Sequence, residues 1–406
     1  CVRFLSIHIQ EQYLPTLLKT IVTRKTMIIG IEGQRLFRKK KHGMDMVALE
    51  LIRNLQAKDT VNQYFIYVAP DVDRSCLTET SNFKIRVIGK NFYPIWEQFS
   101  LPKAAKADGC QLLHCTSNTA PLFTNIPLVV TLHDIIYMEK SLLQIVTGKG
   151  TAYQKFGNVY RRLVVPRILK SSQKVITVSN FEKQRITDFF KLGNNKLTAI
   201  YNGVGKHFKK VTDPIELQRV KQKYRLPDKF FFHLGNTDPK KNTTGVLKAY
   251  ANFLRTSNEL IPMVMLDYEI NELQKLLNEM NEPDLFKSIH LTGYVVNTDL
   301  PAIYSQCEQF LYPSLRESFG IPILEAMACG APVISSNTSC MPEISGGAAW
   351  LVNPFDTNEI THAMISLHSD QQLANSFIEK GFAQSSKFSW HQMAADVLKL
   401  YGTILK

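Results

Sequence analysis

The sequence predicts an α/β protein made of two doubly wound domains, and three features carry that prediction. Short apolar runs recur along the 406 residues and alternate with longer stretches of helical period. The runs do not alternate with polar residues, as Leu128–Leu132 shows, which is typical of parallel strands covered by helices on both faces. This β-α pattern occurs twice, on either side of a glycine-containing break at 201–205, and so indicates two sheets.

The predicted strands fall into two sets. The first set comprises 27–31, 63–69, 84–88, 111–114, 128–132, 174–178 and 197–200. The second set comprises 230–234, 262–266, 288–292, 308–312, 332–335 and 348–352. Between strands, 45–55 and 242–254 place their apolar residues on one helical stripe, which predicts helices that pack against the sheets.

We expect four segments along the chain. Residues 1–26 are an N-terminal extension, because Met27 opens the first buried strand. Residues 27–204 form the first domain and 205–386 the second. Residues 387–406 have helical period and are expected to pack back on the first domain.

Composition narrows the class of protein. The hydrophobic content of 45% is typical of a globular chain. Seven scattered cysteines form no C-x-x-C pair, which argues against a zinc site or a disulfide framework. With no long apolar run and no signal-like start, we predict a cytoplasmic protein with reduced thiols. A peripheral position at the inner face of the membrane is compatible with this prediction.

The net charge of +13 is informative about which molecules the protein can bind, not about its fold. Its densest run is Arg35–Lys41, which is either a solvated loop or a patch for anions. In the second case Arg38, Lys39, Lys40 and Lys41 contact an anionic membrane or a phosphate-bearing acceptor. Aromatic residues do not interleave the patch, so no nucleic-acid partner is expected.

The segment 312–335 carries the most chemistry. A strand ends near Tyr312, a polar loop follows, and a helix opens near Gly320 and ends at Gly330. A helix start at the carboxyl end of a parallel strand is an anion site. Glu317 and Glu325 flank that start. Pyrophosphate on the amides and sugar hydroxyls on the carboxylates would fit this arrangement, which suggests a nucleotide sugar; two solvated glutamates are the plain alternative.

The stretch from Glu317 to Val333, ESFGIPILEAMACGAPV, closely resembles the E-x₇-E motif of the glycosyltransferase family 4 type. The resemblance covers nearly the whole chain from Met27 and implies the GT-B fold, with two facing Rossmann-like domains. Its smaller landmarks are His133 with Asp134, then 175–180, 201–204, 234–242, 291–295, 342–343 and 354–356.

The resemblance implies roles for individual residues. Glu317, His133 and Lys241 are the expected catalytic residues: Glu317 binds the donor sugar, Lys241 neutralises the leaving pyrophosphate, and His133 lies across the cleft. Glu325 is expected to bind the ribose hydroxyls. The other expected donor-binding residues are Lys240, Asn236, Gly235, Ser318, Phe319, Gly320, Ile321, Gly43, Tyr294 and Val295.

Two departures from the family pattern affect the donor site. Asn236 stands where many relatives carry arginine, so phosphate neutralisation is expected to fall on Lys240 and Lys241, or on Arg35 of the other domain. Leu266–Tyr268 stands where the family has a glycine-rich strand end. The identity of the donor's nucleobase therefore stays undetermined.

The resemblance implies a retaining hexosyltransferase that uses GDP-mannose or a UDP-hexose and a glycan or lipid-linked acceptor. It implies no cofactor and no metal, and Asp71 and Asp73 are read as a turn. Three alternatives stay open: a sugar-nucleotide epimerase, a phosphorylase, and a sugar-nucleotide-binding protein without activity. Release of nucleoside diphosphate that depends on an acceptor would separate them.

Overall fold

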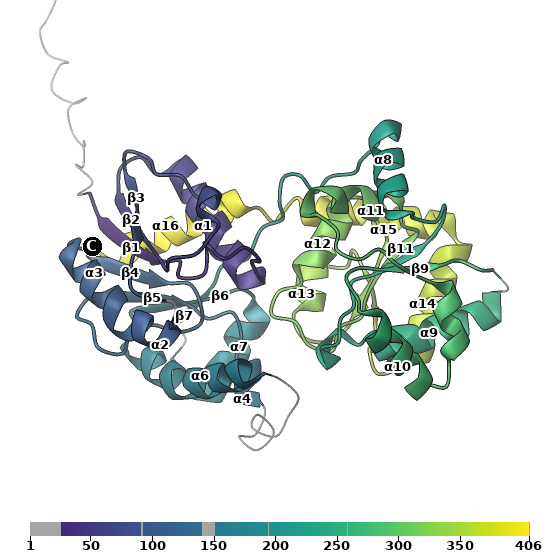
Figure 1. The fold of residues 1–406 in the computed structure, drawn as a ribbon, viewed down its shortest axis with the longest axis horizontal. Coiled ribbons are helices and arrows are strands. Elements are labelled where there is room, and N and C mark those ends of the chain that lie inside the picture. Colours follow the sequence, from purple (N-terminus) through teal and green to yellow (C-terminus); the bar gives the residue numbers. More distant parts are fainter. Residues whose placement is uncertain (1–25, 91, 140–150, 194, 258, 406) are drawn as a thin grey trace, which may run out of the picture.

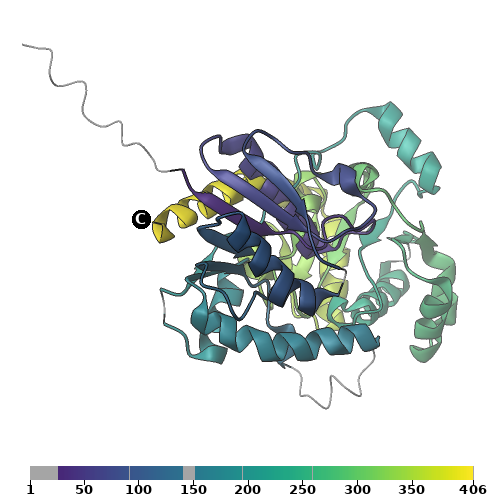
Figure 2. The same cartoon turned by 60° about the vertical axis from the view of Figure 1, so that its left-hand side comes forward.

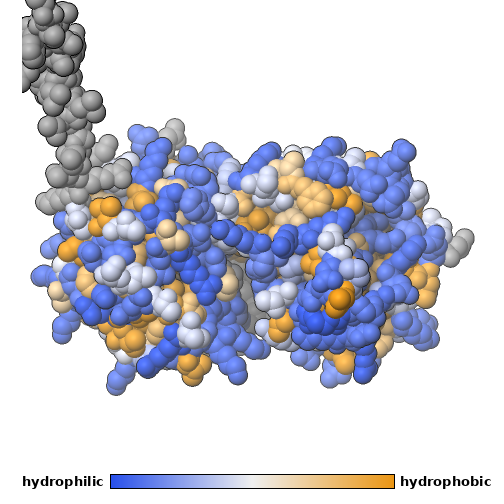
Figure 3. Space-filling model, turned by 90° about the horizontal axis from the view of Figure 1, so that it is seen from above, coloured by the Kyte–Doolittle hydropathy of each residue, from blue (hydrophilic) through white to orange (hydrophobic). Residues whose placement is uncertain are grey.

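The computed structural model describes residues 26–90, 92–139, 151–193, 195–257 and 259–405. They form two lobes side by side, each built around a parallel sheet covered by helices (Figure 1). Seen from above, the surface is largely hydrophilic, and a furrow separates the lobes over part of their width (Figure 3). The predicted α/β class with two doubly wound sheets is confirmed. Residues 1–25 of the expected N-terminal extension lie outside the described residues.

The first sheet has seven parallel strands in the order β3-β2-β1-β4-β5-β6-β7. In chain order they are β1 (Ile28–Glu32), β2 (Gln63–Val68), β3 (Phe83–Val87), β4 (Leu112–Cys115), β5 (Leu128–Thr131), β6 (Lys174–Thr177) and β7 (Leu197–Ala199). Each predicted strand of the first set is present, with its ends shifted by no more than one residue.

The second sheet has six parallel strands in the order β10-β9-β8-β11-β12-β13. In chain order they are β8 (Phe231–His233), β9 (Met263–Met265), β10 (Ile289–Leu291), β11 (Gln309–Tyr312), β12 (Val333–Ser336) and β13 (Trp350–Val352). The predicted strands of the second set are also all present, because continuous apolar runs are the sequence signature of strands buried on both faces.

Helices cover both faces of the first sheet. α1 (Gly43–Lys58) and α16 (Trp390–Ile404) pack on one face, around Ile31, Ile66 and Val129. α3 (Leu101–Ala107), α6 (Ala152–Ser171) and α7 (Asn180–Phe190) pack on the other. In the described part of this lobe, the shorter helices are η1 (Arg74–Cys76), α2 (Tyr93–Ile95), η2 (Trp96–Ser100) and α4 (Ile136–Glu139).

The second sheet is covered in the same way, and neighbouring residues of a strand face opposite layers. Phe232 joins α8 (Pro214–Tyr224), α11 (Leu300–Gln306), α12 (Ile321–Ala328) and α13 (Met341–Ser345). Phe231 joins α9 (Thr243–Ser257), α10 (Ile270–Glu279) and α14 (Thr357–Ser369). The remaining helices are η3 (Pro239–Lys241), η4 (Pro283–Ser288), η5 (Asn297–Asp299) and α15 (Gln371–Ser385).

The chain crosses between the lobes twice, and the two crossings touch. Val204 forms an isolated parallel bridge with Ser389, and a Cβ on Gly203 would lie 2.0 Å from the backbone nitrogen of Trp390. After the second crossing, α16 lies along the first sheet (Figures 1 and 2), where Met393, Val397 and Tyr401 are buried. The last helix of the chain therefore belongs to the core of the first lobe.

Two further observations concern the chain as a whole. In the described ranges, no helix combines the length and the apolar character that a membrane span requires. The six cysteines in those ranges are free thiols.

Candidate active site

The strand order of each sheet reverses at one place. In the first sheet the reversal lies between β1 and β4, and in the second between β8 and β11. The loops that leave the carboxyl ends of such a strand pair diverge to opposite faces, and the crevice between them is where open α/β sheets bind ligands. In the second sheet, these two loops carry Lys241 and Glu317.

Lys241 and Glu317 form an ion pair at this crevice. The Lys241 ammonium lies 2.7 Å from Glu317 Oε1 and donates a second hydrogen bond of 2.7 Å to the Tyr312 hydroxyl. The side chains of Lys241 and Glu317 are 17% and 11% exposed. An ammonium has three N–H donors, so one remains for a ligand. The two predicted catalytic residues of the second domain are thus brought together.

The helix start next to this pair has the geometry that the sequence predicts. Gly320 has φ +87 and precedes α12, and glycine adopts this left-handed conformation without the cost that a Cβ imposes. Pro322 lies in the first turn, where a missing N–H costs nothing. The backbone of Gly320 and Ile321 therefore lies at the positive end of the α12 dipole.

Glu325 lies one turn further along α12 and has a different partner. The Tyr304 hydroxyl is 3.4 Å from its Oε2 atom. Burial raises the pKa of Glu325 to about 7, and the Tyr304 hydrogen bond opposes that shift. Tyr304 is on α11, and no motif in the sequence pointed to it.

The remaining donor-site residues before Lys241 lie in the loop after β8. Gly235 is buried, and a Cβ there would lie 2.4 Å from the His233 ring. Asn236 is exposed, and its Oδ1 accepts the Asp238 N–H at 2.8 Å. The Lys240 ammonium lies 3.8 Å from Asp238. The ammonium groups of Lys240 and Lys241 consequently have different partners, and of these two lysines only Lys241 contacts Glu317.

Three more predicted donor-binding residues have side chains engaged elsewhere. Phe319 is 3% exposed and packs near Tyr201 and Phe388 at the crossing, so only its backbone can face a donor. Val295 is buried in the core beside α11, whereas the neighbouring Tyr294 is 68% exposed. The Ser318 hydroxyl donates to Asp134 Oδ2 at 2.8 Å, which connects the second lobe to the first.

His133 lies at the carboxyl end of β5 in the first sheet and is 4% exposed. Its Nε2 atom is 3.0 Å from the Thr116 carbonyl, which requires the proton on Nε2 and leaves Nδ1 as an acceptor. Burial lowers the pKa of His133, so the ring is neutral at pH 7. The Ser318–Asp134 bond places this edge opposite the loop of Glu317.

The Arg35–Lys41 run divides into separate environments. Arg35 is partly buried, 3.9 Å from Asp45 and stacked over the Tyr93 ring. Lys41 donates to Asp73 at 2.5 Å, so it does not add free charge to the predicted patch; Lys39 and Lys40 are exposed. Gly43 begins α1 with open space around it, since nothing lies within 4 Å of a Cβ built there.

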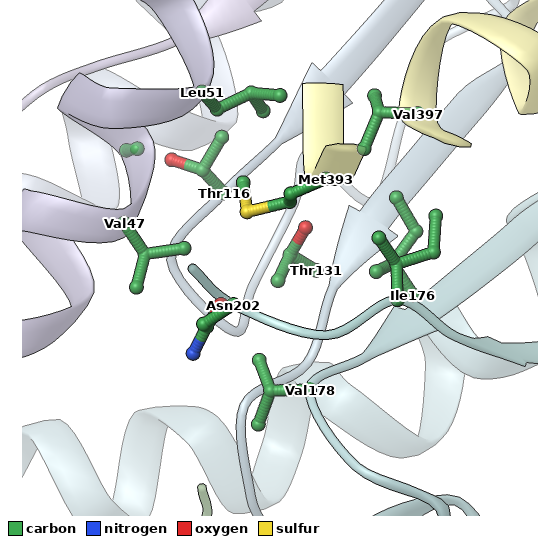
Figure 4. A pocket seen from close by; sticks show the side chains of 11 residues that line it. Val47, Leu51, Thr116, Thr131, Ile176, Val178, Asn202, Met393 and Val397 are labelled. Carbon is green, nitrogen blue, oxygen red and sulfur yellow. The ribbon is translucent and has the colours of Figure 1, made fainter. Parts of the chain in front are cut away.

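A small cavity lies within the first lobe between α1, α16 and the sheet. Figure 4 shows Thr116, Thr131 and Asn202 among mostly apolar side chains that line it. Its volume of about 10 Å³ is that of roughly one water-sized sphere. It is too small for a sugar and belongs to the packing of α16.

Several contacts could not be found from the sequence. Ser339, which has φ +58, exchanges two hydrogen bonds with the backbone of Glu317, at 2.6 and 3.2 Å. Arg316 donates to the Glu317 carbonyl at 2.9 Å. These residues hold the main chain of Glu317, and their role depends on loop geometry that no spacing in the sequence encodes.

Comparison with known proteins agrees with this geometry. The model of "Glycosyltransferase Family 4" matches residues 42–206, and that of "Glycosyl transferases group 1" matches residues 214–384. The chain belongs to the family 4, group 1 glycosyltransferases. Its fold is accordingly the GT-B fold, as the E-x₇-E resemblance implied.

Individual relatives match this glycosyltransferase-family chain over somewhat more than half of its length. It is 32% identical over 224 residues to the serotype-specific mannosyltransferase WbdA of Escherichia coli, over 54% of this chain and 27% of that protein. It is 31% identical over 237 residues to the O-antigen chain mannosyltransferase B of E. coli, over 57% and 61%. The chain thus spans about a quarter of WbdA and three fifths of the second relative.

Among solved structures, Anabaena Alr3699/HepE in complex with UDP and glucose superposes with a TM-score of 0.71. The superposition covers 93% of this chain and 100% of that one, at 18% sequence identity. At this level of identity the likeness concerns the fold.

Proposed function

We propose that this protein transfers a mannosyl group from GDP-mannose to a hydroxyl of a glycan or lipid-linked acceptor, with retention at the anomeric carbon. The observation that carries the proposal is the Lys241–Glu317 pair at the switch point of the second sheet, beside the start of α12. The names of the E. coli relatives support mannose as the sugar. A UDP-hexose is the competing donor.

In this proposal each side chain has one task. The remaining N–H of Lys241 and the start of α12 stabilise the negative charge that develops on the leaving diphosphate. Glu317 accepts hydrogen bonds from the donor sugar, and Glu325 accepts them from the ribose. His133 belongs to the first lobe, on the side expected to hold the acceptor substrate. Its ring is neutral, and its Nδ1 atom can accept a hydrogen bond. Lys241 supplies the cationic charge, so turnover is expected to persist in EDTA.

The test is a panel of GDP-mannose, UDP-glucose and UDP-galactose with mannose-containing oligosaccharide and polyprenyl-linked acceptors. We expect nucleoside diphosphate release that requires both GDP-mannose and an acceptor, and a product whose NMR coupling constants show retained configuration. Acceptor-dependent release of UDP, seen with a UDP-hexose and not with GDP-mannose, would identify the UDP-hexose as the donor. Absence of both release and binding for every donor would refute the proposal.

A further inference from the structure

Arg316 directly precedes Glu317 and reaches from the second lobe into the first. It pairs with Glu182 of α7, and its Nη2 atom lies 3.3 Å from Glu139 of α4. Its guanidinium also lies 4.9 Å from the ring centroid of Phe181. Because its side chain is 14% exposed, these contacts are largely shielded from water, which strengthens charge interactions.

The Glu182 end of this pair is completely buried. Its side chain has 0% exposure, and its Oε2 atom has no hydrogen-bond partner among the described residues. Burial raises the pKa of Glu182 to about 7, while Arg316 acts to lower it. A buried carboxylate with so few partners depends on its counter-ion, and removal of one member of such a pair leaves an uncompensated charge.

The residue on the other side of Glu317 is also held by the first lobe. The Ser318 hydroxyl donates to Asp134 at 2.8 Å, and the Ser318 carbonyl accepts the Ser179 hydroxyl at 2.9 Å. Arg316 also donates a hydrogen bond of 2.9 Å to the carbonyl of Glu317 itself. The main chain of Glu317 is therefore fixed between two points of attachment to the opposite lobe.

A second group of contacts lies beside the first. Glu343 of α13 accepts the backbone N–H groups of Asn180 and Phe181, at 2.7 and 2.9 Å, at the start of α7. It also accepts the Tyr201 hydroxyl at 2.7 Å. A carboxylate at a helix N-terminus is stabilised by the dipole. Two side chains of the second lobe thus contact the start of α7. Glu343 accepts hydrogen bonds from its first N–H groups, and Arg316 pairs with Glu182 in its first turn.

We propose that Arg316 is a positioning residue that couples the placement of Glu317 to closure of the two lobes, through its pair with Glu182. The inference rests on the proposed function, in which Glu317 contacts the donor sugar. When the lobes separate, Arg316 loses Glu182 and Glu139, and the carbonyl of Glu317 loses a donor held in place from the opposite lobe. The site is then complete only in the closed form.

The test uses the full chain with Arg316→Gln, Glu182→Gln and the double variant. The matched control is Arg185→Gln, which removes a 2.9 Å pair with the same Glu139 within the first lobe. We expect kcat to fall about a hundredfold in both single variants, as for misplacement of a reacting group by about 1 Å. The kcat of the double variant should be no lower than that of the more impaired single variant, because both substitutions remove the same ion pair. The control should stay within twofold.

Small-angle X-ray scattering supplies a readout that does not depend on turnover. We expect a larger radius of gyration for Arg316→Gln and Glu182→Gln, and no change for Arg185→Gln. An unchanged radius of gyration in both variants would overturn the proposal, even if kcat fell. Unchanged kcat in Arg316→Gln would overturn it as well.

The two proposals fail in different ways. If the wild-type protein turns over no donor, the proposed function fails, and scattering still decides whether Arg316 holds the lobes together. If Arg316→Gln does not fold, Glu139→Gln removes the second acceptor of Arg316 near the surface. That variant should shift both readouts in the same direction by a smaller amount, and a wild-type result in both would count against the inference.

Discussion

The carboxyl ends of the two sheets use their acidic residues differently. At the second sheet, Glu317 is paired with one lysine and keeps some exposure. At the first sheet, Glu97 is completely buried and accepts hydrogen bonds from Tyr93, Thr119, Tyr160 and Gln98. The first arrangement keeps donors and acceptors available to a ligand, whereas the second uses the carboxylate to join α2, η2, α6 and the loop after β4. An acidic residue at a sheet edge is therefore informative only together with its partners.

The Lys241–Glu317 pair is where substitution should have its largest effect. Lys241→Gln and Glu317→Gln should each lower kcat by about 10²–10³-fold, the usual cost of losing one group that stabilises developing charge. Steady-state release of nucleoside diphosphate measures this. Lys248→Gln is the control, because Lys248 is an exposed lysine of α9 to which no role in donor binding is assigned. A loss of less than tenfold in both variants would remove these residues from the proposed mechanism.

Substitution of Glu97 should affect stability rather than donor binding. Glu97→Leu removes the acceptor that the side chains of Tyr93, Thr119, Tyr160 and Gln98 share, and we expect it to lower the free energy of unfolding by about 2–4 kcal/mol. Urea unfolding measures the loss, with Glu50→Gln on α1 as a control near the surface. Weaker donor binding at unchanged stability would show that the first-sheet edge also acts on the donor.

Glu325 should make donor affinity depend on pH. Burial raises the pKa of Glu325 to about 7, so in the free protein it is mostly protonated below that pH. Ribose hydroxyls that donate to the carboxylate favour its charged form. Affinity for GDP-mannose should therefore rise with pH, by up to about tenfold per unit below pH 7, and level off above it.

Calorimetry in two buffers of different ionisation enthalpy would detect the accompanying proton release. Glu325→Gln should flatten the profile, and Glu279→Gln on the exposed face of α10 should not. A wild-type profile that is flat between pH 5.5 and 8, a window around the pKa of Glu325, would mean that the ribose does not bind this carboxylate.

The smallest expected effect concerns the exposed lysines of the first lobe. If Lys39 and Lys40 contact an anionic membrane, each contributes about 1 kcal/mol to binding at low salt. Co-sedimentation with phosphatidylserine vesicles should weaken for Lys39→Glu with Lys40→Glu. It should hardly change for Lys41→Gln with Asp73→Asn, because that control removes the Lys41–Asp73 pair without altering the net charge. Equal binding by all three proteins would leave the run as a solvated loop.

Much of the fold follows from local pattern. The strands were predictable because a parallel strand buried on both faces requires a continuous apolar run. The two ends of α12 were predictable because Gly320 and Pro322 satisfy the backbone requirements of its start and Gly330 those of its end. The exact boundaries of the domains stay a prediction, as do the roles of the individual donor-binding residues.

The sequence by itself determined the two doubly wound sheets, the α12 helix start and the E-x₇-E pair, since these depend on residues close together in the chain. Only the tertiary structure decided which groups share a contact. It paired Lys241 with Glu317 rather than leaving each to a ligand, took Lys41 out of the basic patch through Asp73, and set Arg316 against Glu182 across the lobes. Such partners lie 32 to 134 residues apart, so only the folded arrangement of both sheets brings them together.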